Sequence, residues 1–158
     1  MTDTIRKAST ADVPAMVDLS EQKRVEYESY QPVFWHKAAD SRAKHLPWIE
    51  RLVTRDNVIA LVHEQDGEVD GFIIADFVPA PPVYDVSGPT CRVDDFTVAN
   101  HKDWEITGRL LLEQVMHEAK QRGAAQIVVV CADLDQPKRA MLAQVGLSLA
   151  SEWYTTPL

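Results

Sequence analysis

The sequence is poor in cysteine, in long apolar runs and in clustered positive charge, and each shortage excludes a class of protein. Its two cysteines, Cys91 and Cys131, are too few for a disulfide-stabilised scaffold, so we expect buried, reduced thiols. The longest apolar run, 127–132, is far too short to cross a bilayer. The first ten residues hold no apolar core, so no secretory signal is predicted. We therefore expect a cytoplasmic protein without membrane contact.

Positive charge is scarce and scattered, since 24 Asp and Glu residues outnumber 16 Lys and Arg residues and give a formal net charge of −8. No Lys/Arg cluster is present to neutralise phosphates, so we expect no nucleic-acid partner. His36 and His101 are too isolated to predict a metal site. The acidity suits a cationic amine substrate and serves equally well for solubility alone. The length of 158 residues predicts one domain over 1–158.

Hydrophobic patterns predict a chain in which strands and helices alternate. The strands are expected over 4–8, 58–63, 69–78, 91–98, 125–130 and 147–156. The helices are expected after a cap at Ser9 or Thr10, over about 40–54 with a kink or restart at Pro47, from Gly108 to a stop at Gly123, and between a cap at Asp135 and Gly146. This order predicts an α/β (α+β) fold with flanking helices.

Two segments indicate how the strands pair. The dipeptide Asp66-Gly67 lies between two strand patterns and favours a tight hairpin. The run 125–130 is nearly all apolar, which is typical of a strand covered on both faces in a parallel sheet. The strand–helix–strand unit that it closes demands a right-handed crossover. The sheet is therefore predicted to be mixed, with a hairpin meander leading into one parallel βαβ unit.

Asp94 and Asp95 are the most informative charged residues, because they interrupt an apolar strand in which aspartate is disfavoured. Successive residues face opposite sides of a regular sheet, and a bulge would re-aim either one. One carboxylate is then a candidate general base, acting directly or through water. The alternative is that each pairs with Arg92 or with a hairpin neighbour.

Aromatic residues gather in two places. Tyr27, Tyr30, Phe34 and Trp35 crowd together, either as an apolar or cation–π wall for an amine or as a small core under a loop. The predicted last strand places Trp153 beside Tyr154, where the pair would form an apolar seam between two copies of the chain. A homodimer is the usual outcome for such an exposed terminal strand.

Four segments, in this order, carry a resemblance to the GNAT (Gcn5-related N-acetyltransferase) superfamily that covers nearly the whole chain. They are TIRKASTADVPAMVDL, VIALVHEQDGEVDGFI, VDDFTV with the following helix that ends in QRGAAQIVVV, and the capped helix that ends at Gly146-Leu147. The resemblance implies a GNAT-like fold in which acetyl-CoA lies between two parallel strands that splay apart, here 91–98 and 127–131. It implies transfer of an acetyl group to a primary amine of a small molecule or peptide, without a metal.

The resemblance also implies a role for particular residues. Asp94 or Asp95 would be the catalytic base. The acceptor pocket would use Tyr30, Phe34, Trp35 and Tyr154, and acetyl-CoA would be held by the backbone of Phe96, Thr97 and Val98 at the pantetheine arm and by Thr107, Gly108 and Arg109 at the pyrophosphate. The helix that begins near Gly108 would present its free amides and positive dipole end to the phosphates.

The sequence departs from the family pattern at two places. Its phosphate-loop positions are Asp103, Ile106 and Gly108, of which only the glycine is kept, and Asp103 is expected to cap the helix itself. Leu142 stands where many members of the family carry a tyrosine acid. The alternative hypothesis is therefore a catalytically weakened binding or regulatory module with the same fold.

Overall fold

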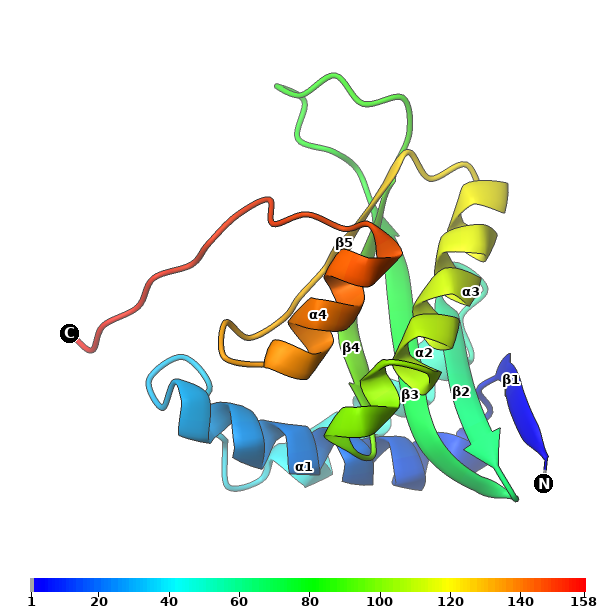
Figure 1. Ribbon diagram of the computed structural model, residues 1–158, viewed down its shortest axis with the longest axis vertical. Coiled ribbons are helices and arrows are strands. Elements are labelled where there is room, and N and C mark those ends of the chain that lie inside the picture. Colours follow the sequence, from blue (N-terminus) through cyan, green and yellow to red (C-terminus); the bar gives the residue numbers. More distant parts are fainter. Residues whose placement is uncertain (1) are drawn as a thin grey trace.

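A five-stranded mixed sheet forms the centre of the computed structural model, which describes residues 2–158. The first four strands are antiparallel neighbours, and the last two run parallel (Figure 1). In sheet order they are β1 (Asp3–Lys7), β2 (Ile59–Gln65), β3 (Glu68–Val78), β4 (Thr90–Val98) and β5 (Gln126–Val129). This arrangement confirms the predicted meander and parallel βαβ unit.

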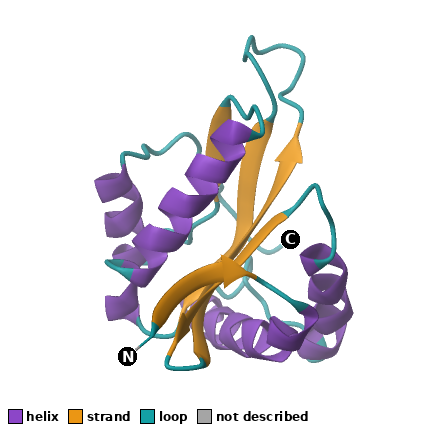
Figure 2. Cartoon of the chain, turned by 90° about the vertical axis from the view of Figure 1, so that its right-hand side faces the viewer, coloured by secondary structure: helices purple, strands orange, loops and turns teal. Residues whose placement is uncertain are grey.

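Helices cover both faces of the sheet, as Figure 2 shows. They are α1 (Val13–Tyr30), α2 (Ser41–Val53), α3 (Thr107–Gln121) and α4 (Gln136–Val145), with short 3₁₀ helices η1 (Thr10–Asp12) and η2 (His101–Trp104). The apolar core on one face is shared with α1 and α2, and the core on the other face with α3 and α4. The second helix continues through Pro47, so the predicted restart does not occur.

The central strands supply both cores by alternation. On β2, Ile59 and Leu61 point to the α3 side, whereas Ala60 and Val62 point to the α1 side. All four side chains are buried, so the strand is apolar throughout. Burial on both faces fixes the register of the sheet, because a slip by one residue would exchange the two faces.

The predicted hairpin joins β2 to β3. Gln65 pairs with Glu68, which leaves Asp66 and Gly67 as a two-residue loop. Both loop residues have positive φ, 52° and 88°. Positive φ at both loop residues defines a type I′ turn, whose twist matches that of the flanking strands and which favours Asp-Gly.

Cap residues set the helix ends as predicted. Ser9 and Asp12 form a capping box at the start of η1. Asp135 accepts a hydrogen bond from the Lys138 amide at the start of α4, and Gly146 ends this helix with a φ of 99°.

The predicted strand over 147–156 is wrong. Residues 147–158 form an extended tail without helix or strand, which leaves the end of α4 and runs outward (Figure 1). The amide of Leu147 bonds to the Leu142 carbonyl, and the rest of the tail makes no backbone hydrogen bond within residues 2–158. The alternating pattern was present, but a strand also needs a partner edge for its backbone groups.

Because the tail forms no strand, β5 also differs from its prediction. This strand has β4 on one side and no neighbour on the other within residues 2–158, and alternate residues of it are exposed. Val128 is 39% exposed. The prediction that this segment is covered on both faces is therefore wrong.

Candidate active site

A β-bulge occurs in β4 at Asp94 and Asp95. Val93 and Phe96 are three residues apart, whereas their partners on β3 are only two apart. The two aspartates therefore share the space of one residue. The extra residue resets the alternation, so that Val93 and Phe96 both point into the α3-side core. This is the bulge considered in the sequence analysis.

The parallel strands part beyond the bulge. Their pairing ends where Val93 meets Val129, and a last bond runs from the Val130 amide to the Val93 carbonyl at 3.1 Å. β4 continues to Val98 without a strand on that side. The gap faces the carboxyl ends of both strands, which is where open α/β sheets bind ligands.

Lys138 of α4 occupies this gap. Its side chain is 1% exposed, and its Nζ donates a hydrogen bond to the Phe96 carbonyl at 3.2 Å. Nζ also lies 5.1 and 5.2 Å from the ring centres of Phe96 and Trp104. Burial, with the charge of Lys23, lowers the pKa of Lys138 to about 8. A backbone acceptor assigned to pantetheine is thus already hydrogen-bonded.

Trp104 explains the glycine that remains in the predicted phosphate loop. A Cβ on Gly108 would lie 2.5 Å from Cε3 of this indole, so residue 108 must lack a side chain for the ring to pack. The indole is buried and meets the Phe96 ring edge-on, with 4.9 Å between centroids. The glycine therefore admits a tryptophan ring, whereas the sequence analysis assigned it to phosphate. Trp104 and Gly108 are four positions apart, which is the spacing of neighbours on one face of a helix. This spacing was a signal in the sequence that could have predicted the contact.

The start of α3 is uncapped. Asp103 accepts hydrogen bonds from the amide and Nδ2 of Asn100, at 3.1 and 2.8 Å, and so caps η2. The prediction that Asp103 caps the longer helix is wrong. Ile106 offers no side-chain cap, and the first bond of α3 runs from the Leu110 amide to the Ile106 carbonyl. The amides of residues 107–109 therefore make no backbone hydrogen bond within residues 2–158, as is usual for the first turn of a helix that lacks a side-chain cap.

A cavity of about 270 Å³ lies at the carboxyl end of β4. Its walls come from α1, the last residues of β4, η2 and the cap of α4, and include Lys23, Tyr27, Thr97, Trp104 and Asp135. Lys23 makes no hydrogen bond or ion pair with any residue in 2–158. Burial lowers its pKa against the attraction of Asp95 and Asp94. The ammonium group of Lys23 at the cavity wall therefore lies near the carboxylates of Asp94 and Asp95.

Tyr27 and Asp135 close one side of this cavity. The phenol donates a 2.6 Å hydrogen bond to Oδ2 of Asp135, and both residues are buried. Burial and the neighbouring carboxylate raise the pKa of Tyr27 above its usual range. The phenol therefore stays protonated as a donor. The sequence predicts Tyr27 in an aromatic cluster and Asp135 at a helix cap, and no local pattern indicates that the two residues meet.

Asp95 belongs to a partly buried polar chain. Its Oδ1 lies 3.4 Å from His45 Nε2, and His45 Nδ1 accepts a 2.8 Å hydrogen bond from Arg24. Because a guanidinium only donates, the ring proton of a neutral imidazole must be on Nε2, facing Asp95. Burial alone would raise the pKa of Asp95, but His45 and the charges of Lys23 and Arg24 outweigh it and lower the pKa. Asp95 is therefore held as a carboxylate.

Asp94 has a different environment. It is exposed, and Arg92 pairs with Asp76 at 2.6 Å instead of with either aspartate of the bulge. The pairing suggested in the sequence analysis is thus wrong for Arg92. The bulge gives one carboxylate to the polar chain and leaves the other facing solvent.

The aromatic cluster forms partly as expected. The Trp35 ring lies 5.1 Å from Tyr27 and 4.6 Å from Phe34, and Tyr30 lies 5.7 Å from Tyr27. Only Tyr27 of this group lines the cavity. Tyr30, Phe34 and Trp35 therefore lie outside the lining of this cavity, and Phe34 is 45% exposed, so the cluster is not a fully buried core.

Tyr154 lies outside the site because the tail forms no strand. It is exposed, and its hydroxyl bonds to Glu152 within the tail. The tail instead brings Trp153 to Phe34, with 6.0 Å between ring centres. Of the predicted phosphate ligands, Arg109 is exposed and bonds to Glu113 at 3.2 Å, and Thr107 is buried.

Cys91 and Cys131 are both unbridged. Within residues 2–158 no cluster of three metal-ligating side chains is found, and no helix is long and apolar enough to span a membrane.

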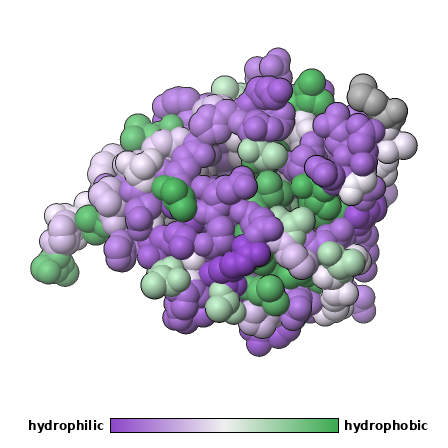
Figure 3. All heavy atoms as spheres, turned by 90° about the horizontal axis from the view of Figure 1, so that it is seen from below, coloured by the Kyte–Doolittle hydropathy of each residue, from purple (hydrophilic) through white to green (hydrophobic). Residues whose placement is uncertain are grey.

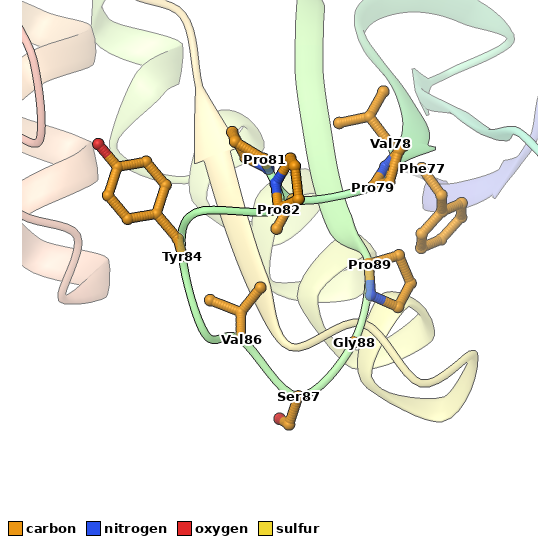
Figure 4. Close-up of a pocket in the computed structure, with 11 residues that line it drawn as sticks. Phe77, Val78, Pro79, Pro81, Pro82, Tyr84, Val86, Ser87, Gly88 and Pro89 are labelled. Atoms are coloured by element: carbon orange, nitrogen blue, oxygen red, sulfur yellow. The ribbon is translucent and has the colours of Figure 1, made fainter.

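A second hollow, of about 670 Å³, lies in the loop between β3 and β4, at the opposite end of β4. Figure 4 shows it bordered by Pro81, Pro82, Tyr84 and Val86 of the same loop. None of its lining side chains is charged, and it has no acid, base or nucleophile beyond Ser87 and the phenol. It therefore lacks the polar groups that orient a reacting ligand.

Comparison with known proteins supports the fold. No family model and no curated protein matches the sequence. A mutant of the BH1408 protein from Bacillus halodurans has a TM-score of 0.85 at 16% identity over 98% of this chain and 99% of its own. A predicted acetyltransferase with acetyl-CoA from Clostridium acetobutylicum has 0.73 at 16% over 99% and 96%. A transcriptional regulator from Bacillus halodurans has 0.72 at 18% over 99% and 100%. The chain has the fold of the GNAT acetyltransferases.

Proposed function

We propose that the chain is an N-acetyltransferase that moves an acetyl group from acetyl-CoA to a primary amine of a small molecule or peptide. The observation that carries the proposal is the parting of β4 and β5 beyond the bulge, beside the uncapped start of α3. The fold it shares with acetyltransferase structures supports the same conclusion.

The two ends of the gap fit acetyl-CoA differently. At the phosphate end, the free amides of residues 107–109 and the Arg109 side chain would hold the pyrophosphate. At the pantetheine end, the Phe96 carbonyl already accepts a hydrogen bond from Lys138 Nζ, so pantetheine would bind there most readily if the lysine side chain moved out of the gap. Acetyl-CoA would supply an activated acetyl thioester.

The acceptor amine would enter over the bulge. The carboxylates that attract Lys23, with Asp95 as the strongest, would hold a substrate ammonium by the same charge. Because its pKa is lowered, Asp95 binds a cation well but accepts a proton poorly. Asp94 faces solvent, so we assign to it the removal of the amine proton, directly or through water.

The proposal is tested by titrating acetyl-CoA into the protein in a calorimeter. Arg109→Glu should weaken binding by about tenfold or more, since it puts a negative charge at the phosphate end. Arg139→Glu is the control, because the two arginine side chains are similarly exposed, 41% and 43%, and each pairs with one nearby carboxylate. Absence of heat at millimolar acetyl-CoA refutes the proposal. Turnover, measured by release of the CoA thiol, should fall in Asp94→Asn with cofactor affinity unchanged.

A second candidate is a binding or regulatory module that does not transfer acetyl groups. The observation that favours it is the hydrogen bond from Lys138 to Phe96, which fills the gap. Lys138→Met removes that bond and keeps most of the side-chain volume. If acetyl-CoA binds to the variant and not to the natural chain, the second candidate is correct.

A further inference from the structure

Lys23 is a cation without a direct partner in the wall of the cavity at the carboxyl end of β4. Within residues 2–158 it makes no hydrogen bond and no ion pair, and its Nζ lies 5.7 Å from the centre of the Tyr27 ring. The next residue of α1, Arg24, pairs with Glu21 at 2.9 Å, so the two cations of this helix differ. A partly buried ammonium without an acceptor is costly, and it points to a ligand that supplies one.

The carboxylates closest to Lys23 in the cavity wall and the bulge are held by other donors. Asp135 accepts a 2.6 Å hydrogen bond from the Tyr27 phenol. Asp95 lies 3.4 Å from Nε2 of His45. Both carboxylates attract the ammonium of Lys23 through space without forming an ion pair with it. The three N–H donors of Lys23 therefore remain for a group that enters the cavity.

The charges around the cavity balance one another. Three cations and three carboxylates interact here, namely Lys23, Arg24, Lys138, Asp94, Asp95 and Asp135. Glu26 also lines the cavity, and it is engaged by His101 and by the Tyr30 hydroxyl. A ligand with one positive and one negative group keeps this balance, whereas a plain amine adds a positive charge and leaves Lys23 without an acceptor.

We infer that the acceptor is a small free amino acid, whose carboxylate binds Lys23 while its amine faces Asp94 and Asp95. The inference rests on the proposed function, since it names the acceptor class of that site. Thr97 and Val98, whose backbone is assigned to pantetheine, line the same cavity. One carbon separates the two charged groups of an α-amino acid, so an amino acid anchored at Lys23 has its amine beside the arm of the cofactor.

The transfer balances with the groups already assigned. The ammonium of the amino acid first gives a proton to Asp94, and the lone pair of the amine attacks the thioester carbon. The carbon–sulfur bond then breaks, and a second proton from the nitrogen passes to the CoA thiolate. The products are an N-acetylamino acid, the CoA thiol and one proton released to water.

The size and surroundings of the cavity suit such an acceptor. Its volume of about 270 Å³ lies below the ~300–1,000 Å³ that is typical of pockets for drug-sized ligands. Hydrophilic side chains cover most of the face on which α1 lies, as Figure 3 shows. The site therefore favours a small charged molecule over an apolar amine.

Turnover of paired acceptors tests the inference. Release of the CoA thiol is measured with free L-alanine, L-serine and L-methionine and with the amides of the same amino acids, which keep the amine and lose the carboxylate charge. We expect kcat/KM to be about tenfold higher or more for the free acids. Intrinsic reactivity favours the amides, because their amine loses its proton more easily, so it cannot produce this preference. Equal or faster turnover of the amides overturns the inference.

Variants of Lys23 test the anchor itself. Lys23→Met should lower kcat/KM for the free acids by about tenfold or more and change that for the amides by less than about threefold. Lys23→Arg keeps the charge and should keep the preference. Lys44→Met, at an exposed lysine of α2, is the matched control. A preference that survives Lys23→Met overturns the inference. If Lys23→Met fails to fold, by circular dichroism, the paired acceptors and Lys23→Arg still decide.

Calorimetry separates failure of this inference from failure of the proposed function. Each free amino acid is titrated into the natural chain and into Lys23→Met, with and without CoA. If acetyl-CoA does not bind and no amine is acetylated, the proposed function is wrong, and amino-acid binding that weakens in Lys23→Met still supports the anchor. Absence of both amino-acid binding and amino-acid turnover overturns the inference, whether or not other amines are acetylated.

Discussion

Replacement of Lys138 by methionine should stabilise the protein at neutral pH. The lysine is buried with one carbonyl acceptor and two aromatic rings, and no carboxylate pairs with it within residues 2–158. The fall of its pKa from an ordinary value of about 10.4 to about 8 corresponds to about 3 kcal/mol against folding with the amine charged. Loss of the hydrogen bond to the Phe96 carbonyl offsets about 1 kcal/mol or more of the stability gained by removing the buried charge. The expected net gain is about 1–2 kcal/mol at neutral pH.

The pH dependence has a definite sign. Below about pH 8 the amine is charged in both the folded and the unfolded chain, so the full penalty is present. Between about pH 8 and about pH 10.4 the folded chain has lost the proton and the unfolded chain has not, so the stability of the natural protein rises with pH. Urea unfolding of both chains across this range should show the advantage of Lys138→Met disappearing. Lys44→Met, at an exposed lysine of α2, is the control. An advantage that is absent at neutral pH, or constant with pH, refutes the reasoning.

Three further changes test other contacts. Asp12→Asn should cost about 2 kcal/mol at neutral pH, because bonds from Arg6 lower the pKa of Asp12 to about 2, and the cost should vanish as the pH falls from about 4 to about 2 in acid unfolding. Tyr27→Phe should cost about 1.5–3 kcal/mol in urea, since it removes a buried donor from a carboxylate. Gly108→Ala should destabilise by about 1–3 kcal/mol despite its better helix propensity, because the methyl group meets the Trp104 ring. A higher free energy of unfolding for Gly108→Ala in urea would contradict the close contact between Gly108 and the Trp104 ring.

The chemistry of neighbouring residues was sufficient to predict much of the fold. Asp66-Gly67 predicts its hairpin because two positive φ angles are required within two residues. Gly146 predicts the end of α4 for the same kind of reason. The aspartate pair in β4 marks an irregular place in the strand, because aspartate is disfavoured there, and the structure has a bulge at this pair. Each signal lies within a few residues of its effect.

The features that could not be predicted from the sequence depend on contacts between segments that lie far apart along the chain. The bond from Lys138 to Phe96 spans 42 residues, and that from Tyr27 to Asp135 spans 108. No local pattern marks a lysine in a first helical turn as the side chain that fills a gap in a sheet. The tail failed for a related reason, since its pattern of alternation is that of a strand, and pairing depends on an edge that the sequence does not reveal.

The cost of burying Lys138 connects the stability of the fold to the use of the gap. A ligand that takes the Phe96 carbonyl must move Nζ to a wetter place, where the ordinary pKa of lysine, about 10.4, is restored. Between about pH 8 and about pH 10, the free protein holds Lys138 largely neutral and the complex would hold it charged, so binding of acetyl-CoA should take up protons. Calorimetry in two buffers of different ionisation enthalpy measures this uptake. It should be close to zero at neutral pH and absent from Lys138→Met at every pH. Binding without proton uptake in the alkaline range would mean that the lysine stays in place and that the ligand lies elsewhere.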